Sequence, residues 1–199
     1  MRFISALLLV IAVLCGCDDD DEVTNPPAAK SLWPLKVGNE WTYENQVLDP
    51  AGAVLQYDTT VFQVAKDTVV EGATWYILTL NGARDSEVLP CRSRSDGVWA
   101  WDGASAFLFW KYPAAVGDSW IILTDTAAIE AVGESVTVPA GTFTCVNYKW
   151  TGSRDPDRVY QYHYMSPGVG RVKSDEYYKT AGDFVYVHFR DLLISYSLK

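Results

Sequence analysis

The sequence Arg158-Val-Tyr-Gln-Tyr-His-Tyr-Met165 places an aromatic ring at every second position. Successive side chains of a β-strand point to opposite faces, so Tyr160, Tyr162 and Tyr164 are predicted to project from one face of a strand. Alternation with period two favours strands over helices, and it recurs along most of the chain. The sequence therefore predicts an all-β protein.

Nine other segments show the strand pattern: 40–47, 54–65, 74–80, 97–101, 107–112, 135–138, 143–150, 171–178 and 184–190. Between the segments lie pairs such as Asn-Gly and Asp-Gly, which are typical of tight reversals. Strands joined by tight turns pair antiparallel. The segment 125–132 could be taken for a short helix, but its length and its β-branched flanks favour a strand.

An internal repeat relates the two halves of the chain. The segment Pro34–Trp41 matches Pro113–Trp120 at Pro, Val, Gly, an Asn or Asp, and Trp. Two looser echoes follow in the same order, 70–75 with 138–143 and 95–98 with 166–169. Each half alone would leave one apolar sheet face bare. We therefore expect halves at about 32–112 and 113–199 to close together as one antiparallel barrel or sandwich, closed or half-closed.

The N-terminus has the parts of a secretory signal, a positive start at Arg2 and an apolar run at 6–14. The segment Leu14-Cys-Gly-Cys17 resembles the bacterial lipobox, which predicts a signal peptide at 1–16 and acylation of Cys17. Acyl chains on Cys17 would hold the protein to a membrane. The expected location is the bacterial cell envelope.

Residues 17–31 are predicted to be an extended tether, because the like charges of Asp18–Glu22 repel one another and Pro26-Pro27 stiffens the chain. The acidic run resembles the surface-export signal of some Bacteroidota lipoproteins. Aspartate directly after the cysteine instead resembles the inner-membrane retention signal of enterobacteria. The outer membrane or cell surface is preferred over the inner membrane.

The length and composition of the rest of the chain, 32–199, predict a single domain. It can bury a sizeable core, since 49% of all residues are hydrophobic. The formal charge is −9, and loss of Arg2 with the signal leaves 15 positive and 25 negative residues, or −10. No basic patch offsets this charge, so nucleic acid is excluded as a partner. Cys91 and Cys145 either form one disulfide in an oxidising compartment or are separate buried residues.

Four sequence segments carry a family resemblance: PLKVGNEWTY at 34–43, YPAAVGDSW at 112–120, VPAGTFTCV at 138–146 and SPGVGRVKS at 166–174. They resemble an uncharacterised group of bacterial lipoproteins and periplasmic proteins, the DUF3108-like and TapB-like β proteins. The resemblance spans 34–174, and its motifs consist of turns that contain glycine and of aromatic residues that would fill the core. It implies the β fold and no particular activity.

The sequence shows no catalytic signature. His163 and His188 lack the spacing of a metal site, and neither nucleophile motifs nor phosphate-binding glycine loops occur. We therefore expect no catalytic residue, no metal and no cofactor, and a protein that is not an enzyme. A hydrolase whose site is assembled from dispersed residues is the remaining enzymatic alternative.

Aromatic residues make up 14% of the chain and are its candidate binding groups. Trp99 and Trp101 share one face of a strand, as Tyr160, Tyr162 and Tyr164 do. Such rings either contact a glycan, protein or lipid ligand or pack across strands. The favoured hypothesis is a membrane-anchored binding or structural module, and the alternative is a carrier that holds an apolar ligand inside a barrel.

Overall fold

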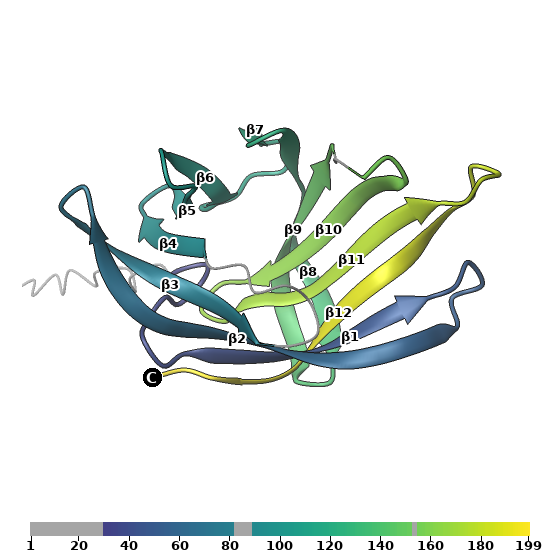
Figure 1. Cartoon of the computed structure of the whole chain (residues 1–199), viewed down its shortest axis with the longest axis horizontal. Coiled ribbons are helices and arrows are strands. Elements are labelled where there is room, and N and C mark those ends of the chain that lie inside the picture. The colour runs from purple at the N-terminus through teal and green to yellow at the C-terminus, as the bar shows by residue number, and fades with distance from the viewer. Residues whose placement is uncertain (1–29, 82–88, 153–154) are drawn as a thin grey trace, which may run out of the picture.

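The computed structural model describes residues 30–81, 89–152 and 155–199, which form one strongly curled antiparallel sheet (Figure 1). The all-β prediction is confirmed. Within the described residues no helix is long and apolar enough to cross a lipid bilayer. The strands are β1 (Glu40–Leu48), β2 (Val54–Val70), β3 (Ala73–Asn81), β4 (Leu89–Arg94), β5 (Gly97–Trp101), β6 (Ala106–Lys111), β7 (Ser119–Ile122), β8 (Asp125–Val138), β9 (Gly141–Thr151), β10 (Arg158–Ser166), β11 (Gly170–Lys179) and β12 (Val185–Ser197).

The strand order is β6-β5-β4-β3-β2-β1-β12-β11-β10-β9-β8-β7, so every strand pairs with its neighbour in sequence and β1 also pairs with β12. The sheet curls until its two edge strands, β6 and β7, approach each other. The fold is therefore a nearly closed barrel, and the sandwich alternative is wrong. Its inner face carries the core, with Trp41, Tyr43 and Tyr148 fully buried.

The two junctions between the halves differ. The β1–β12 junction is a regular ladder that runs from Glu40 opposite Ser197 to Val47 opposite Phe189. No ladder joins β6 to β7 in the described part of the chain. Side chains bridge this seam instead.

At the seam, Trp120 Nε1 donates to the carbonyl oxygen of Leu108 at 3.1 Å. Tyr148 Oη donates to that of Lys111 at 2.7 Å. The Lys111 ammonium also lies 3.0 Å from the Asp118 carboxylate. Three side-chain contacts therefore stand where the other junction has a backbone ladder.

The repeated motif has the same backbone geometry in both halves. Gly38 and Gly117 both have φ of 88°, a conformation that glycine adopts without strain. The Gly38 N–H donates to Val64 O at 2.9 Å, and the Val64 N–H donates to Asn39 O at 2.9 Å. Gly117 donates in the same way to Ile129 O at 3.0 Å. With the predicted boundary after residue 112, the first half contains β1 to β6 and the second contains β7 to β12.

The segment that precedes β1 belongs to the barrel. Leu32 and Trp33 are 2% and 4% exposed, and the Trp33 ring lies edge-on to Trp41 with centroids 5.8 Å apart. Ser31 O accepts a hydrogen bond of 2.7 Å from Gly168 N, in the β10–β11 turn. The chain therefore enters the core within a few residues of the predicted tether.

The predicted strands are all present, and 125–132 is the first part of β8 as expected. Two strands were missed. β4 contains Pro90 and alternating arginines, which hide its strand character, and β7 is only four residues long.

Candidate ligand-binding cavity

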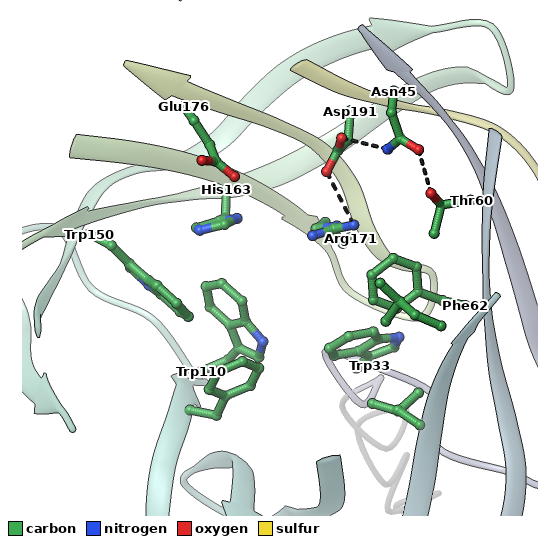
Figure 2. Close-up of a pocket in the computed structure, with 13 residues that line it drawn as sticks. Trp33, Asn45, Thr60, Phe62, Trp110, Trp150, His163, Arg171, Glu176 and Asp191 are labelled. Atoms are coloured by element: carbon green, nitrogen blue, oxygen red, sulfur yellow. Dashed lines mark hydrogen bonds and ion pairs between the residues drawn. The ribbon is translucent and has the colours of Figure 1, made fainter. Parts of the chain in front are cut away.

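A cavity of about 320 Å³ lies inside the barrel (Figure 2). One side of it is apolar and mostly aromatic, and the other is polar. The apolar side is formed by Trp33, Phe62, Leu78, Leu80, Phe109, Trp110 and Trp150. The polar side is formed by Asn45, Thr60, His163, Arg171, Glu176 and Asp191. Both halves of the chain thus contribute to the lining.

Asp191 on β12 organises the polar side. Its Oδ1 accepts a 2.6 Å hydrogen bond from Asn45 Nδ2, and its Oδ2 accepts a 2.9 Å bond from Ser174 Oγ. Asn45 in turn accepts a hydrogen bond from the Thr60 hydroxyl (Figure 2). The Asp191 side chain is only 9% exposed, so these neutral donors stabilise a buried carboxylate.

Arg171 on β11 is the cation of the cavity. Its Nη2 lies 3.4 Å from Asp191 Oδ2, a longer contact than either hydrogen bond from the neutral donors. The guanidinium carbon lies 4.6 Å from the ring centroids of both Tyr43 and Phe62, close enough for cation–π attraction. Arg171 is therefore held by two aromatic faces and one carboxylate.

His163 on β10 lies beside two tryptophan rings. The centroid of its imidazole is 4.6 Å from that of Trp150 and 5.1 Å from that of Trp110. Burial holds the pKa of His163 well below its usual 6.5, and the charges of Arg171 and Arg158 lower it further. The imidazole is therefore neutral at physiological pH.

Several buried polar atoms of the cavity lining have no hydrogen-bond partner. Three are N–H donors at the cavity, namely Trp110 Nε1, Trp150 Nε1 and Arg171 Nε. Trp33 Nε1 is a fourth, although it lies against Gly170. His163 Nδ1 is the fifth atom. Buried polar groups are almost always satisfied in proteins, by the protein, by water or by a ligand, so this concentration makes the cavity the candidate site.

The burial of His163 predicts a pH-dependent stability. Below pH 6.5 the unfolded chain takes up a proton that the folded chain does not, so the free energy of unfolding falls as the pH falls. We expect a loss of up to about 1.4 kcal/mol per pH unit below 6.5, continuing until the lowered pKa is reached. Urea unfolding of wild type and His163→Gln between pH 7 and pH 5 measures this. Equal pH slopes for the two proteins would contradict it.

Comparison with solved structures finds the same fold in two bacterial proteins. One is a predicted exported protein with a YmcC-like fold from Bacteroides fragilis, with TM-score 0.58 and 14% identity over 85% of this chain and 100% of that one. The other is a predicted lipoprotein from Parabacteroides distasonis, with TM-score 0.53 and 15% identity over 85% of this chain and 99% of that one. The comparison with curated proteins gave no match.

Residues 130–185 match the model of the DUF3108-like family. This confirms the expected resemblance over that segment, which contains two of the four motifs that suggested it, those at 138–146 and 166–174. The DUF3108-like segment runs from β8 to the start of β12 and carries Trp150, His163, Arg171 and Glu176. It therefore supplies one wall of the cavity, while Trp33, Trp110 and Asp191 lie outside it.

The predicted tyrosine row belongs to the same segment but faces away from the cavity. On β10, Gln161, His163 and Met165 are buried, whereas Tyr160, Tyr162 and Tyr164 alternate with them and are partly exposed. The three tyrosines therefore project from the outer face of the barrel.

Neighbouring side chains cover the tyrosine row. The Tyr160 ring lies 4.6 Å from that of Tyr177 on β11, and Lys149 Nζ lies 4.9 Å from the Tyr160 ring. Lys173 Nζ lies 5.2 Å from the Tyr164 ring. These contacts are those of cross-strand packing. The role of the row in ligand contact stays a prediction.

Trp99 and Trp101 also lie on the outer face, since Val98 and Ala100, which alternate with them on β5, are buried in the core. Trp101 contacts Trp75 with ring centroids 6.0 Å apart. Trp99 Nε1 donates to Asp96 at 2.8 Å. The structure therefore brings neither tryptophan to the cavity or to the tyrosine row.

The remaining predicted residues are cysteines. Cys91 on β4 and Cys145 on β9 are free and buried, and burial raises the pKa of each thiol to about 12. Both are therefore unreactive as they stand, and the disulfide stays a prediction. Cys17 lies outside the described residues. Within those residues, no group of three or more His, Cys, Asp and Glu side chains is placed to hold a metal ion.

Proposed function

We propose that the protein is a lipoprotein of the bacterial envelope that binds a small ligand inside its barrel without chemical turnover. The lipobox-like sequence ending at Cys17 supports the anchor, and the acidic run after it supports the outer membrane or cell surface. The resemblance in fold to an exported protein and a lipoprotein is consistent with an envelope location.

The cavity carries the proposal. Its volume of about 320 Å³ lies in the range of small-molecule sites, roughly 300–1,000 Å³. Leaving a buried N–H group without a partner costs about 1–3 kcal/mol. Since three such groups stand at this one cavity, a bound molecule that accepts their hydrogen bonds would remove that cost.

The polar side of the cavity favours a ligand with a polar end over a purely apolar one. A carrier of a purely apolar ligand would place hydrocarbon against Asp191, Arg171 and His163, whose polar atoms it cannot bind. A ligand with one polar and one apolar end fits both sides. The absence of turnover is proposed because Asp191 and Thr60 are already engaged with Asn45. Hydrolysis in a broad screen of esters, glycosides and phosphates would overturn that part.

Filling the cavity should abolish binding. Leu80 lines the cavity from β3, and Leu80→Trp replaces its aliphatic side chain with a larger indole ring. Native mass spectrometry of protein purified from its own membrane should show a co-purified small molecule on the wild type. Its occupancy on Leu80→Trp should be at least about tenfold lower, which corresponds to about 1.4 kcal/mol of binding free energy.

Tyr160→Ala is the matched control, because it removes a large ring from the outer face and leaves the cavity intact. Circular dichroism establishes that both variants are folded. Retention by Tyr160→Ala and loss by Leu80→Trp supports the cavity. The reverse result, or a wild type that carries no ligand, would contradict ligand binding in the cavity. The outer aromatic surface would then be the favoured binding site.

A further inference from the structure

We infer that the ligand is an amphipathic anion, whose carboxylate binds at Arg171 and Trp110 and whose apolar part lies along Trp150. This inference rests on the proposed function and adds the chemical class of the ligand. It follows from the unpartnered donors, from the way Arg171 is held, and from the arrangement of the rings.

The hydrogen-bonding groups of the cavity call for an acceptor. Trp110 is 97% buried, being 3% exposed, and its indole N–H has no partner, as is true of Trp150 Nε1 and Arg171 Nε. Indole and guanidinium groups donate only. The exception is His163 Nδ1, which accepts when Nε2 donates to Gln161 at 3.2 Å. With Trp33 Nε1 set aside because it lies against Gly170, donors outnumber the acceptor three to one, and a carboxylate offers the most acceptor sites for its size.

Arg171 forms an ion pair with Asp191 through Nη2, which leaves its Nε–H without a partner. Asp191 is bound most closely by Asn45 and Ser174, at 2.6 and 2.9 Å, and only at 3.4 Å by Arg171 Nη2. The second carboxylate of the lining, Glu176, lies 4.0 Å from Arg158 on β10. Arg171 thus keeps an unpartnered Nε–H at the cavity, suited to a charge-assisted hydrogen bond to an incoming anion.

The environment of His163 points the same way. The two charges that act on its imidazole belong to Arg171 and Arg158, and both lower its pKa. The lining itself holds one guanidinium, Arg171, and two carboxylates, Asp191 and Glu176, of which Glu176 lies 4.0 Å from Arg158. The place for an anion is therefore beside the unpartnered Nε–H of Arg171, away from the two carboxylates.

The aromatic side of the cavity indicates what the apolar part of the ligand is. Trp110 and Trp150 are stacked, with centroids 4.7 Å apart and planes 28° apart, and Phe109 lies edge-on to Trp150 at 5.4 Å. Figure 2 shows the Trp110 and Trp150 rings across the cavity from Asp191. A short alkyl or aryl group on the rings and a carboxylate at Arg171 would fill both sides.

The test uses three probes that differ only in the headgroup: 4-phenylbutyrate, 4-phenylbutan-1-ol and 4-phenylbutylamine. Binding to the mature full chain in lipid nanodiscs is measured by isothermal titration calorimetry, with empty nanodiscs as the blank. We expect the carboxylate to bind at least about tenfold more tightly than the alcohol, and the amine to bind most weakly.

Two variants locate the headgroup. Arg171→Met combined with Asp191→Asn removes the pair without leaving a lone buried charge, and it should abolish the preference for carboxylate over alcohol. Trp110→Phe keeps a ring and removes one N–H, and it should weaken 4-phenylbutyrate more than the alcohol. It also serves as the second variant if the double variant fails to fold. Tyr160→Ala should bind all three probes as the wild type does.

The outcomes separate this inference from the proposed function. If the alcohol or the amine binds as tightly as the carboxylate, the cavity binds ligands but the anionic class is wrong. If the preference survives both Arg171→Met/Asp191→Asn and Trp110→Phe, the headgroup does not lie where we place it. If none of the three probes binds the wild type, the cavity itself is refuted together with its ligand class.

Discussion

Replacing Asp191 with alanine is expected to destabilise the barrel by about 3–5 kcal/mol. The substitution leaves the Arg171 guanidinium, itself only 15% exposed, without its carboxylate. It also removes the acceptor of the Asn45 amide and the Ser174 hydroxyl. The loss is large because breaking a buried ion pair from one side strands the other charge in a poorly solvated place.

Denaturant unfolding followed by fluorescence measures the effect of Asp191→Ala. The double variant Arg171→Met/Asp191→Asn should recover most of the loss, since it leaves no lone charge. Lys179→Ala is the surface control, because Lys179 forms an exposed 4.0 Å pair with Asp183 and such pairs contribute less than about 1 kcal/mol. Similar losses for Asp191→Ala and Lys179→Ala would show that the Asp191 network is not structurally important.

Trp41→Ala should cost a comparable amount, about 3–5 kcal/mol. The Trp41 side chain is fully buried, packs edge-on against Trp33, and donates its indole N–H to the carbonyl oxygen of Val169. Truncation would leave a large void at the point where the first half meets the β10–β11 turn. It would also leave that carbonyl without this donor.

The repeat offers a matched control for Trp41. Trp120 occupies the equivalent position in the second half, but it is only partly buried and lies at the open seam. Trp120→Ala should therefore cost clearly less than Trp41→Ala in the same unfolding experiment. Equal losses would mean that burial does not set the difference between the two sites.

Much of the fold could be predicted from local pattern. Alternation identified ten strands, and the two turns that the repeat matched, at Gly38 and Gly117, have the same φ of 88°. The duplication of whole halves stays a prediction. The pattern failed at β4, where Pro90 and the arginines interrupt the apolar alternation, although this strand pairs on both sides. It also could not distinguish a barrel from a sandwich, because curvature and closure depend on contacts between distant strands.

The candidate site was harder to predict, because bulges change which face a side chain occupies. Strict alternation places Arg171 outside with Lys173, but the register skips Val172, so Arg171 pairs with the inward-facing Met165. A second skip at Phe109 lets Phe109 and Trp110 both line the cavity. The alternation of the tyrosine row was visible in the sequence because β10 itself has no skipped residue from Tyr160 to Met165 in its pairing with β9, so the three rings all face outward.

The unequal junctions between the halves also determine how the interior can be reached. The β1–β12 ladder joins the two halves on one side, and the edge strands β6 and β7 meet on the other side. Separating these two edges breaks the hydrogen bonds of Trp120 and Tyr148, the Lys111 ion pair and the packing of Trp110 on Trp150, but no backbone ladder. Phe109 and Trp110 lie on the edge strand β6, so a ligand that entered at this seam would contact the aromatic side of the cavity first. The β1–β12 ladder would stay intact during that entry.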